Sequence, residues 1–450
     1  MLDLQDFDVS PTSGFLPSEY PVARLSLPYY QPWEDLVANL PALLLSRRIR
    51  VLVDKLPILS TDKLTSIAEV RRAYQVLGFL AHAYVWGVNE PTDRIPESVA
   101  RPLVDTAETL GLPPLATYAG LCLWNFKEIM PTGNSIKNLD LDNLTTINTF
   151  TGSIDESWFY LVSVFFEYKG AGTIRTGVES IAHAQNGDSD KLIGSLQKLA
   201  QAIDELGTVL MRMEEMCDPH VFYFRIRPYL AGWKNMADAG LNKDGVFYGN
   251  EQKPRAYAGG SNAQSSMIQF LDSLLSVKHF STGERPVPHQ TTDSQTTKTA
   301  GPRNDYLMDM RQYMPRKHRE FLATIDRDSC IRDFVMKNKE NSALVLAYDA
   351  CLAMLKLFRD KHIQIVTRYV VLQAKQVGKM GSLLTLRSGL AKKKKLGAEE
   401  KGTGGTSLLP FLKQCRDETG DPAAGSWGQR ILSDGVMRLR YSKPNGINED

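Results

Sequence analysis

The segment from Leu344 to Val371 carries a long helical pattern of apolar residues, LVLAYDACLAMLKLFRDKHIQIVTRYVV. Its large apolar side chains recur at spacings of three, four and seven, which predicts one apolar stripe along a long helix. The stripe comprises Tyr348, Leu352, Leu355, Phe358, Ile365, Val366 and Tyr369. Helical patterns of this kind recur along the chain, while the alternation that is typical of strands is weak throughout. We therefore expect an all-α fold with at most a minor hairpin.

His362 lies inside this stripe, four residues after Phe358 and four before Val366. An imidazole that faces a core needs partners for its ring nitrogens, because an unpaired buried polar group is costly. Two interpretations stay open on this pattern alone. The more common one is a core histidine that bonds a backbone carbonyl. The other is a metal ligand, and a single imidazole without a second ligand nearby suits the axial position of a haem iron.

The composition is that of an ordinary globular protein and argues against two classes of partner. The chain has 450 residues, 43% hydrophobic and 23% charged, which is enough for a large core and two domains. Lys and Arg number 53 against 51 for Asp and Glu, so we expect no nucleic-acid-binding surface. The longest uncharged run, Thr109 to Phe126, is interrupted by Pro113 and Pro114, so we expect no membrane span.

The cysteines and the N-terminal residues predict a cytoplasmic protein. The five cysteines contain no CxxC pair, which is typical of reduced thiols and not of a disulfide framework or zinc site. The first ten residues, MLDLQDFDVS, lack the basic and apolar regions of a secretory signal.

Changes in pattern divide the chain into three expected parts. Residues 1–150 should form a small, mainly helical N-terminal domain, and residues 151–418 a larger helical domain. Two polar insertions interrupt the larger domain at 281–304 and 378–401. The second contains a run of four lysines at positions 392–395, which is typical of a solvated loop. Residues 419–450 form a C-terminal tail.

Three short segments are candidates for a site. Pro228 breaks a helical pattern, which places Arg227 at a helix entrance where its guanidinium can turn toward a cavity. The small residues from Ala258 to Ser266 would let backbone approach a ligand, or form an ordinary loop before a helix. The sequence KGTGGT at 401–406 lacks the Gly-Lys-Ser/Thr ending of a phosphate-binding loop, so we interpret it as a hinged lid.

Taken together, these segments resemble the indoleamine 2,3-dioxygenase family. The matching segments are FYFRIRPYLAGWKN (222–235), AGGSNAQSS (258–266), FRDKHIQIVTRYV (358–370) and KGTGGT (401–406), with MRQYMPRKHREFL (310–322) and AYVWG (83–87) in addition. The resemblance extends from about residue 20 to 418, and the chain is more similar to the fungal branch than to the animal one.

The resemblance implies a large helical haem-binding domain, with the smaller N-terminal domain capping the distal side of a noncovalently held haem b. It implies oxidative opening of the indole C2–C3 bond of L-tryptophan, or of a related indoleamine, with O₂ to give N-formylkynurenine. This reaction is the first step of the kynurenine pathway, which serves tryptophan breakdown and NAD synthesis. The resemblance further implies an external electron donor that keeps the haem ferrous, and a monomeric protein.

The resemblance also assigns roles to individual residues. His362 matches the proximal ligand of the haem iron, and Arg227 matches the arginine that binds the substrate carboxylate. Cofactor contacts are implied for Gly260, Ser261, Arg359 and Asp272. Substrate contacts are implied for Tyr118, Phe159, Phe222, Tyr223, Leu230, Ser261, Asn262 and Gly404. Ser163 matches the distal-pocket serine, and Thr403, Gly404 and Gly405 match the lid, so the expected catalytic group is Arg227, Ser163 and Thr403.

Two alternatives remain beside this expectation. Tyr223 and Asn262 are polar where animal members carry phenylalanine and alanine, which leaves room for a modified indole from secondary metabolism. The same scaffold could also serve as a non-catalytic O₂-binding or haem-binding protein, although Arg227 and the 401–406 lid argue against that.

Overall fold

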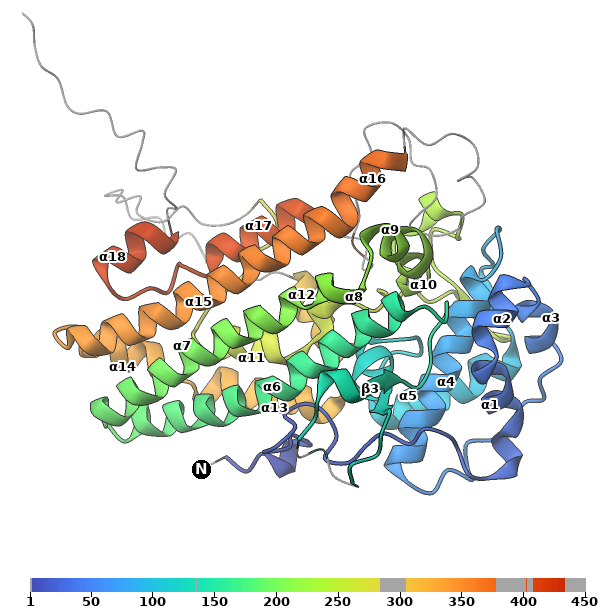
Figure 1. Cartoon of the computed structure of the whole chain (residues 1–450), viewed down its shortest axis with the longest axis horizontal. Helices are drawn as coiled ribbons and strands as arrows, with labels where there is room; N and C mark the ends of the chain where they lie inside the picture. The colour runs from blue at the N-terminus through green and yellow to red at the C-terminus, as the bar shows by residue number, and fades with distance from the viewer. Residues whose placement is uncertain are drawn as a thin grey trace, which may run out of the picture.

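The computed structural model of the chain describes residues 2–133, 136, 138–283, 305–377, 402 and 408–433. Within these residues the regular structure is mainly helical, and the strands form two short pairs (Figure 1). β2 (Phe126–Glu128) pairs antiparallel with β3 (Leu144–Thr146), and β1 (Arg94–Ile95) pairs parallel with β4 (Phe247–Tyr248). The prediction of an all-α fold is confirmed.

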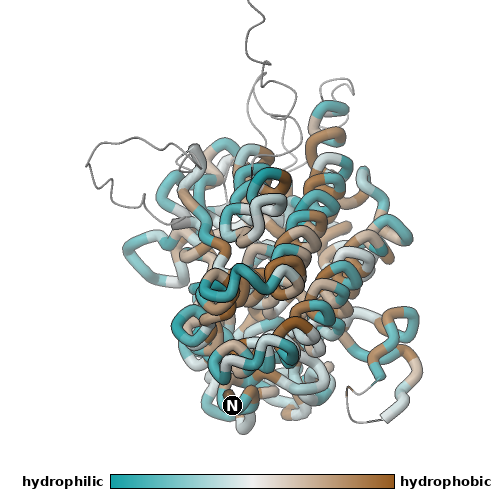
Figure 2. The backbone as a smooth tube through the Cα atoms, turned by 90° about the vertical axis from the view of Figure 1, so that its left-hand side faces the viewer, coloured by the Kyte–Doolittle hydropathy of each residue, from teal (hydrophilic) through white to brown (hydrophobic). Residues whose placement is uncertain are grey.

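Three long helices form the body of the molecule. α6 (Ile154–Gln185) and α15 (Ser342–Val366) both pack against α7 (Ser189–Met211), and the three run side by side in Figure 1. Each begins at a residue whose side chain accepts a backbone N–H of the first turn, which defines where the helix starts. Figure 2 shows hydrophobic and hydrophilic residues alternating along the long helices, as amphipathic packing requires.

All seven residues of the stripe predicted on α15 are buried. The α-helix ends at Val366, and a π-helical turn (Thr367–Val371) and α16 (Leu372–Val377) continue it. The hydroxyl of Tyr369, in this turn, donates to the carbonyl oxygen of Cys217 at 2.7 Å. The long C-terminal helix was therefore predicted correctly, but its last turn is wider than a regular α-helix.

The N-terminal part of the chain contributes α4 (Ile67–Trp86) and four shorter helices. The shorter ones are α1 (Gln31–Ala38), α2 (Leu40–Leu45), α3 (Ile49–Val53) and α5 (Glu97–Leu110). The apolar core of these helices continues into later residues such as Trp233 and Tyr248, and β1 pairs with β4 across the same junction. The boundary at residue 150 stays a prediction.

The remaining helices surround the three long ones. They are α8 (Met213–Met216), α9 (Pro219–Val221), α10 (Arg227–Leu230), α11 (Ser266–Leu274), α12 (Asp305–Arg311), α13 (Arg316–Asp328), α14 (Ile331–Lys337), α17 (Leu408–Glu418) and α18 (Ser426–Gly428). None of the helices in the described ranges has both the length and the apolar character that a bilayer crossing demands. Most of the insertion expected at 281–304, and all of that at 378–401, lie outside the described residues.

Candidate active site

A cavity of about 260 Å³ lies among residues of α6, α15 and α17, and residues between 222 and 230 and between 260 and 265 contribute to its lining. Its lining is mainly apolar, and it brings together most of the site residues expected from the sequence. Those that line it are Tyr118, Phe159, Ser163, Phe222, Arg227, Leu230, Gly260, Ser261, Asn262, Asp272, Arg359 and His362. Residues from six separate stretches of the chain therefore meet in one cavity.

His362 faces this cavity from α15. Among the described residues its imidazole has no hydrogen-bond partner, unlike His82, which has both ring nitrogens engaged by backbone groups at 2.7 and 3.2 Å. Burial, followed by the neighbouring charge of Arg359, lowers the pKa of His362 to about 4. The ring is therefore neutral at pH 7 and able to donate a lone pair into the cavity. The carbonyl-bonded core histidine is not what the described residues show.

These features fit an axial haem ligand. A neutral imidazole suits iron, and the cavity beside it is mainly apolar with a few polar side chains pointing into it, as is typical of cofactor sites. The aromatic rings of the wall pack against one another. The ring centres of Phe159 and Phe222 are 4.9 Å apart, and those of Phe222 and Tyr369 are 5.8 Å apart. All three rings line the cavity.

Arg227 is placed as the Pro228 break predicts. A π-helical turn (Phe222–Ile226) precedes it, and α10 begins at Arg227 with the proline in its first turn. A proline costs least in the first turn of a helix, where its missing N–H would have no intrahelical partner. The guanidinium is buried and reaches the cavity wall. A buried fork of five donors is suited to a carboxylate.

Tyr223 differs from its expected place. It is buried but does not line the cavity, and the Arg227 guanidinium carbon lies 5.2 Å from the centre of its ring. The ring therefore supports the guanidinium through a cation–π contact. Tyr223 thus contacts Arg227, four positions later in the chain, and is not among the residues that line the cavity.

The backbone of the loop before α11 packs closely against the backbone of residues 230–232, as its small residues suggested. A Cβ added to Gly259 would overlap the carbonyl of Leu230 and the amide of Gly232. The side chain of Ser261 accepts the Ala263 amide and so caps the short 3₁₀ turn Asn262–Gln264. Gln264 fixes the loop, since its side chain accepts from the Tyr118 amide at 2.9 Å and donates to the Gly259 carbonyl at 2.8 Å.

Glu167 is a site residue that the sequence analysis missed. It lies on α6 one turn after Ser163, fully buried, and its Oε1 accepts from Tyr118 at 2.9 Å and from Ser265 at 2.6 Å. Both donors line the cavity. Burial raises the pKa of Glu167 to about 7, and the two hydroxyls offset only part of that rise. The available signal was that Glu167 follows Ser163 by one turn on a mainly apolar helix, on the same face as a second carboxylate, Glu156.

Arg359 and Asp272 form a buried ion pair at the cavity wall. The Arg359 Nη2 donates to both carboxylate oxygens at 2.7 Å, and Nη1 donates to the hydroxyl of Thr419. Behind the pair lie His279 and Glu418, which no sequence pattern singled out. Both Arg359 and Asp272 line the cavity, so a cation is present at its edge.

The expected lid is only partly described. Gly402 lines the cavity. Thr403, Gly404 and Gly405 lie outside the described residues, so their expected roles remain predictions.

Comparison with known proteins gives a consistent match over most of the chain. The family model for indoleamine 2,3-dioxygenase matches residues 3–422. An indoleamine 2,3-dioxygenase of Saccharomyces cerevisiae is 47% identical over 433 residues, which cover 92% of each chain. A 6-hydroxytryptophan 2,3-dioxygenase of Fusarium equiseti is 35% identical and covers 93% of this chain and 97% of its own. Human indoleamine 2,3-dioxygenase 2 is 32% identical, with 93% and 95% covered.

Proposed function

Because the chain belongs to the indoleamine 2,3-dioxygenase family of haem dioxygenases, we propose that it opens the indole ring of L-tryptophan with O₂ and releases N-formylkynurenine. The observation that carries this proposal is that His362 and Arg227 face the same apolar cavity. One supplies a neutral ligand for iron and the other a cation for a carboxylate. An amino acid held by Arg227 would thus lie in the cavity that holds the cofactor.

The cofactor supplies the oxygen chemistry when it is bound, and the protein supplies binding, orientation and exclusion of water. His362 would hold the iron, with Arg359 facing the anionic edge of haem b and Gly260 and Ser261 beside the ring. The aromatic pair Phe159 and Phe222 offers an apolar surface for an indole.

The polar residues of the wall have narrower proposed roles. Arg227 binds the substrate carboxylate, which fixes the indole at the far end of the amino acid. Ser163 donates at 3.4 Å to the carbonyl of Phe159, so its hydroxyl oxygen can accept from a ligand in the cavity. Glu167 holds the hydroxyl of Tyr118 in place through the 2.9 Å bond. The enzyme would act as a cytoplasmic monomer with an external electron donor.

The test is turnover by the purified, haem-loaded and reduced protein. With L-tryptophan and air, we expect the absorbance of N-formylkynurenine to rise. His362→Ala should give protein without a haem Soret band, while Arg227→Ala should keep the band and lose most of the turnover. A normal Soret band in His362→Ala would refute His362 as the haem ligand. If the wild-type protein binds haem but forms no product, the proposed activity is wrong and an O₂-binding or haem-binding role is the alternative.

A second candidate substrate is a modified indole. Asn262 lines the cavity and adds an amide that could bond a polar ring substituent. The Fusarium equiseti relative, named for 6-hydroxytryptophan, makes hydroxylated tryptophans the obvious comparison. A panel of L-tryptophan and ring-hydroxylated tryptophans separates the two candidates by kcat/KM. An Asn262→Ala variant should change the ratio of kcat/KM between hydroxylated and unmodified tryptophan only if the amide bonds the ring substituent.

A further inference from the structure

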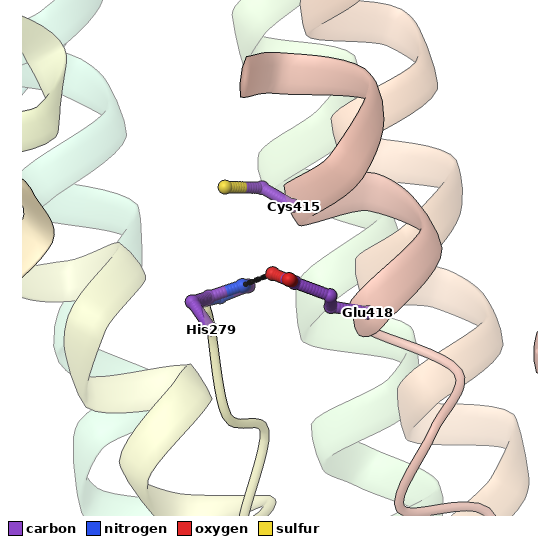
Figure 3. A group of neighbouring side chains, drawn as sticks. All are labelled: His279, Cys415 and Glu418. Carbon is purple, nitrogen blue, oxygen red and sulfur yellow. Dashed lines mark hydrogen bonds and ion pairs between the residues drawn. The ribbon is translucent and has the colours of Figure 1, made fainter. Parts of the chain in front are cut away.

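A second layer of charged side chains lies behind the Asp272–Arg359 pair, away from the cavity. His279 follows α11, and its Nδ1 is 2.6 Å from Oε2 of Glu418 on α17 (Figure 3). Its Nε2 is 3.2 Å from Oδ2 of Asp272. Glu418 also accepts from the Phe280 amide at 3.2 Å and from Gln414 at 2.7 Å. His279 therefore bridges two carboxylates, one of which holds Arg359.

The donor atoms of His279, Cys415 and Glu418 resemble a metal site, but the distances favour an ion pair. Figure 3 shows His279 and Glu418 pointing toward each other with Cys415 one turn away. Two ligands of a tetrahedral zinc ion would lie about 3.3 Å apart, given bonds of roughly 2.0–2.2 Å. The 2.6 Å between Nδ1 and Oε2 is a charge-assisted hydrogen bond and leaves no place for an ion between them.

The hydrogen bonds determine the charge of each group. Nδ1 of His279 faces Glu418, while Nε2 lies 3.2 Å from Oδ2 of Asp272 and 3.3 Å from Nη2 of Arg359. With a carboxylate as the nearest partner of each nitrogen, we assign the ring as a cation that donates to both carboxylates. Burial alone would lower the pKa of His279, but the charge of Asp272 outweighs it and raises that pKa well above its usual value. Burial likewise opposes ionisation of Asp272, yet Arg359 and His279 bring its pKa below the usual value. Glu418 only accepts, as a carboxylate does.

The cluster thus holds two cations, Arg359 and His279, and two anions, Asp272 and Glu418. The side chains of His279 and Glu418 are 8% and 0% exposed, so solvent screens them little. Removing one member would leave a net charge close to the cavity wall. An uncompensated buried charge acts over a long range because the surrounding dielectric is low.

We propose that His279 and Glu418 are positioning residues that hold the Asp272–Arg359 pair at the cavity wall and keep this wall electrically balanced toward an anionic cofactor edge. This inference rests on the proposed function, since the cofactor concerned is the haem whose propionates would face Arg359. His279 acts from behind Asp272 and touches no ligand. Glu418, together with the neighbouring Thr419, connects the same pair to α17.

The test uses charge variants of the full-length, haem-loaded protein. His279→Gln leaves one extra negative charge, Glu418→Gln leaves one extra positive charge, and the double variant restores the balance. Lys234→Gln, which removes a cation from an exposed pair with Asp309, is the control. The readouts are the rate of haem loss to an excess of a haem-binding acceptor protein and the midpoint potential of the iron.

The expected shifts have opposite signs. His279→Gln should speed haem loss and lower the potential, because added negative charge repels the propionates and favours ferric iron. Glu418→Gln should slow haem loss and raise the potential. The rate of haem loss, and the equilibrium constant between ferrous and ferric iron, should each change roughly fourfold to fifteenfold, the effect of one unit charge over about 10–20 Å at an effective dielectric of about 20. The double variant and the control should stay near wild type.

A purely structural role would move both single variants in the same direction, and that result would overturn the inference. Unchanged midpoint potentials in single variants that retain haem would also overturn it. The same holds if the purified wild-type protein contains one equivalent of zinc and the His279→Gln variant contains none. If His279→Gln does not fold, the sign of the Glu418→Gln shift still decides. Wild-type protein without a Soret band would instead refute the proposed function.

Discussion

Glu167→Gln tests whether the buried carboxyl that bonds the cavity-lining residues Tyr118 and Ser265 is protonated near neutral pH. The side chain is fully buried and has a folded-state pKa of about 7, against 4.5 for an ordinary glutamate. A carboxyl with a raised folded-state pKa binds its proton more tightly in the native protein. Its contribution to stability is therefore complete below about pH 4.5 and is lost as the pH rises toward and through 7.

The magnitude follows from the two pKa values. Between pH 5 and pH 8.5, the linkage relation gives a loss of about 2.5 kcal/mol in unfolding free energy through this one group. Glutamine has nearly the same shape and keeps an oxygen that can accept from Tyr118 and Ser265. It cannot ionise, so this part of the pH dependence should disappear in the variant.

The assay is urea unfolding of wild type and Glu167→Gln at pH 5, 7 and 8.5. All other titrating groups are shared, so the difference between the two proteins isolates Glu167. Wild type should lose about 2.5 kcal/mol more than the variant over this range. Glu179→Gln, on the same helix but only half buried, is the control and should follow wild type. Parallel pH profiles for wild type and Glu167→Gln would refute the reasoning.

Further predictions concern the arginine proposed to bind the substrate, a buried histidine and two glycines. Arg227→Lys should keep the charge but lose the planar fork, lowering kcat/KM for L-tryptophan roughly tenfold to hundredfold without changing the Soret band. Burial lowers the folded-state pKa of His82 to about 4 from 6.5. The unfolding free energy of wild type should therefore fall by about 2 kcal/mol through this group between pH 7 and pH 5. His82→Gln should lack that loss in urea unfolding. Gly259→Ala should destabilise the fold by more than about 2 kcal/mol, because its Cβ would overlap backbone. Gly172→Ala, in a helix with open space around it, should instead add about 0.5–1 kcal/mol, and a reversed order in thermal unfolding would contradict both.

The local features of this protein could be predicted from its sequence because they depend on neighbouring residues. Helical periodicity placed His362 on the buried stripe of α15, and Pro228 placed Arg227 at the start of α10. Each rule concerns residues within a few positions of one another, where helix geometry alone determines which side chains share a face. The family resemblance then identified the cofactor that His362 would hold.

Only the tertiary structure decided which helices meet and which polar groups share a proton or a charge. Glu167 finds Tyr118 and Ser265 at sequence separations of 49 and 98, and His279 meets Glu418 at a separation of 139. No periodicity encodes such pairs, because they form when distant segments pack into one core. The sequence therefore determined which side chains could enter the cavity, while packing determined their burial, and burial sets the pKa and the charge of each.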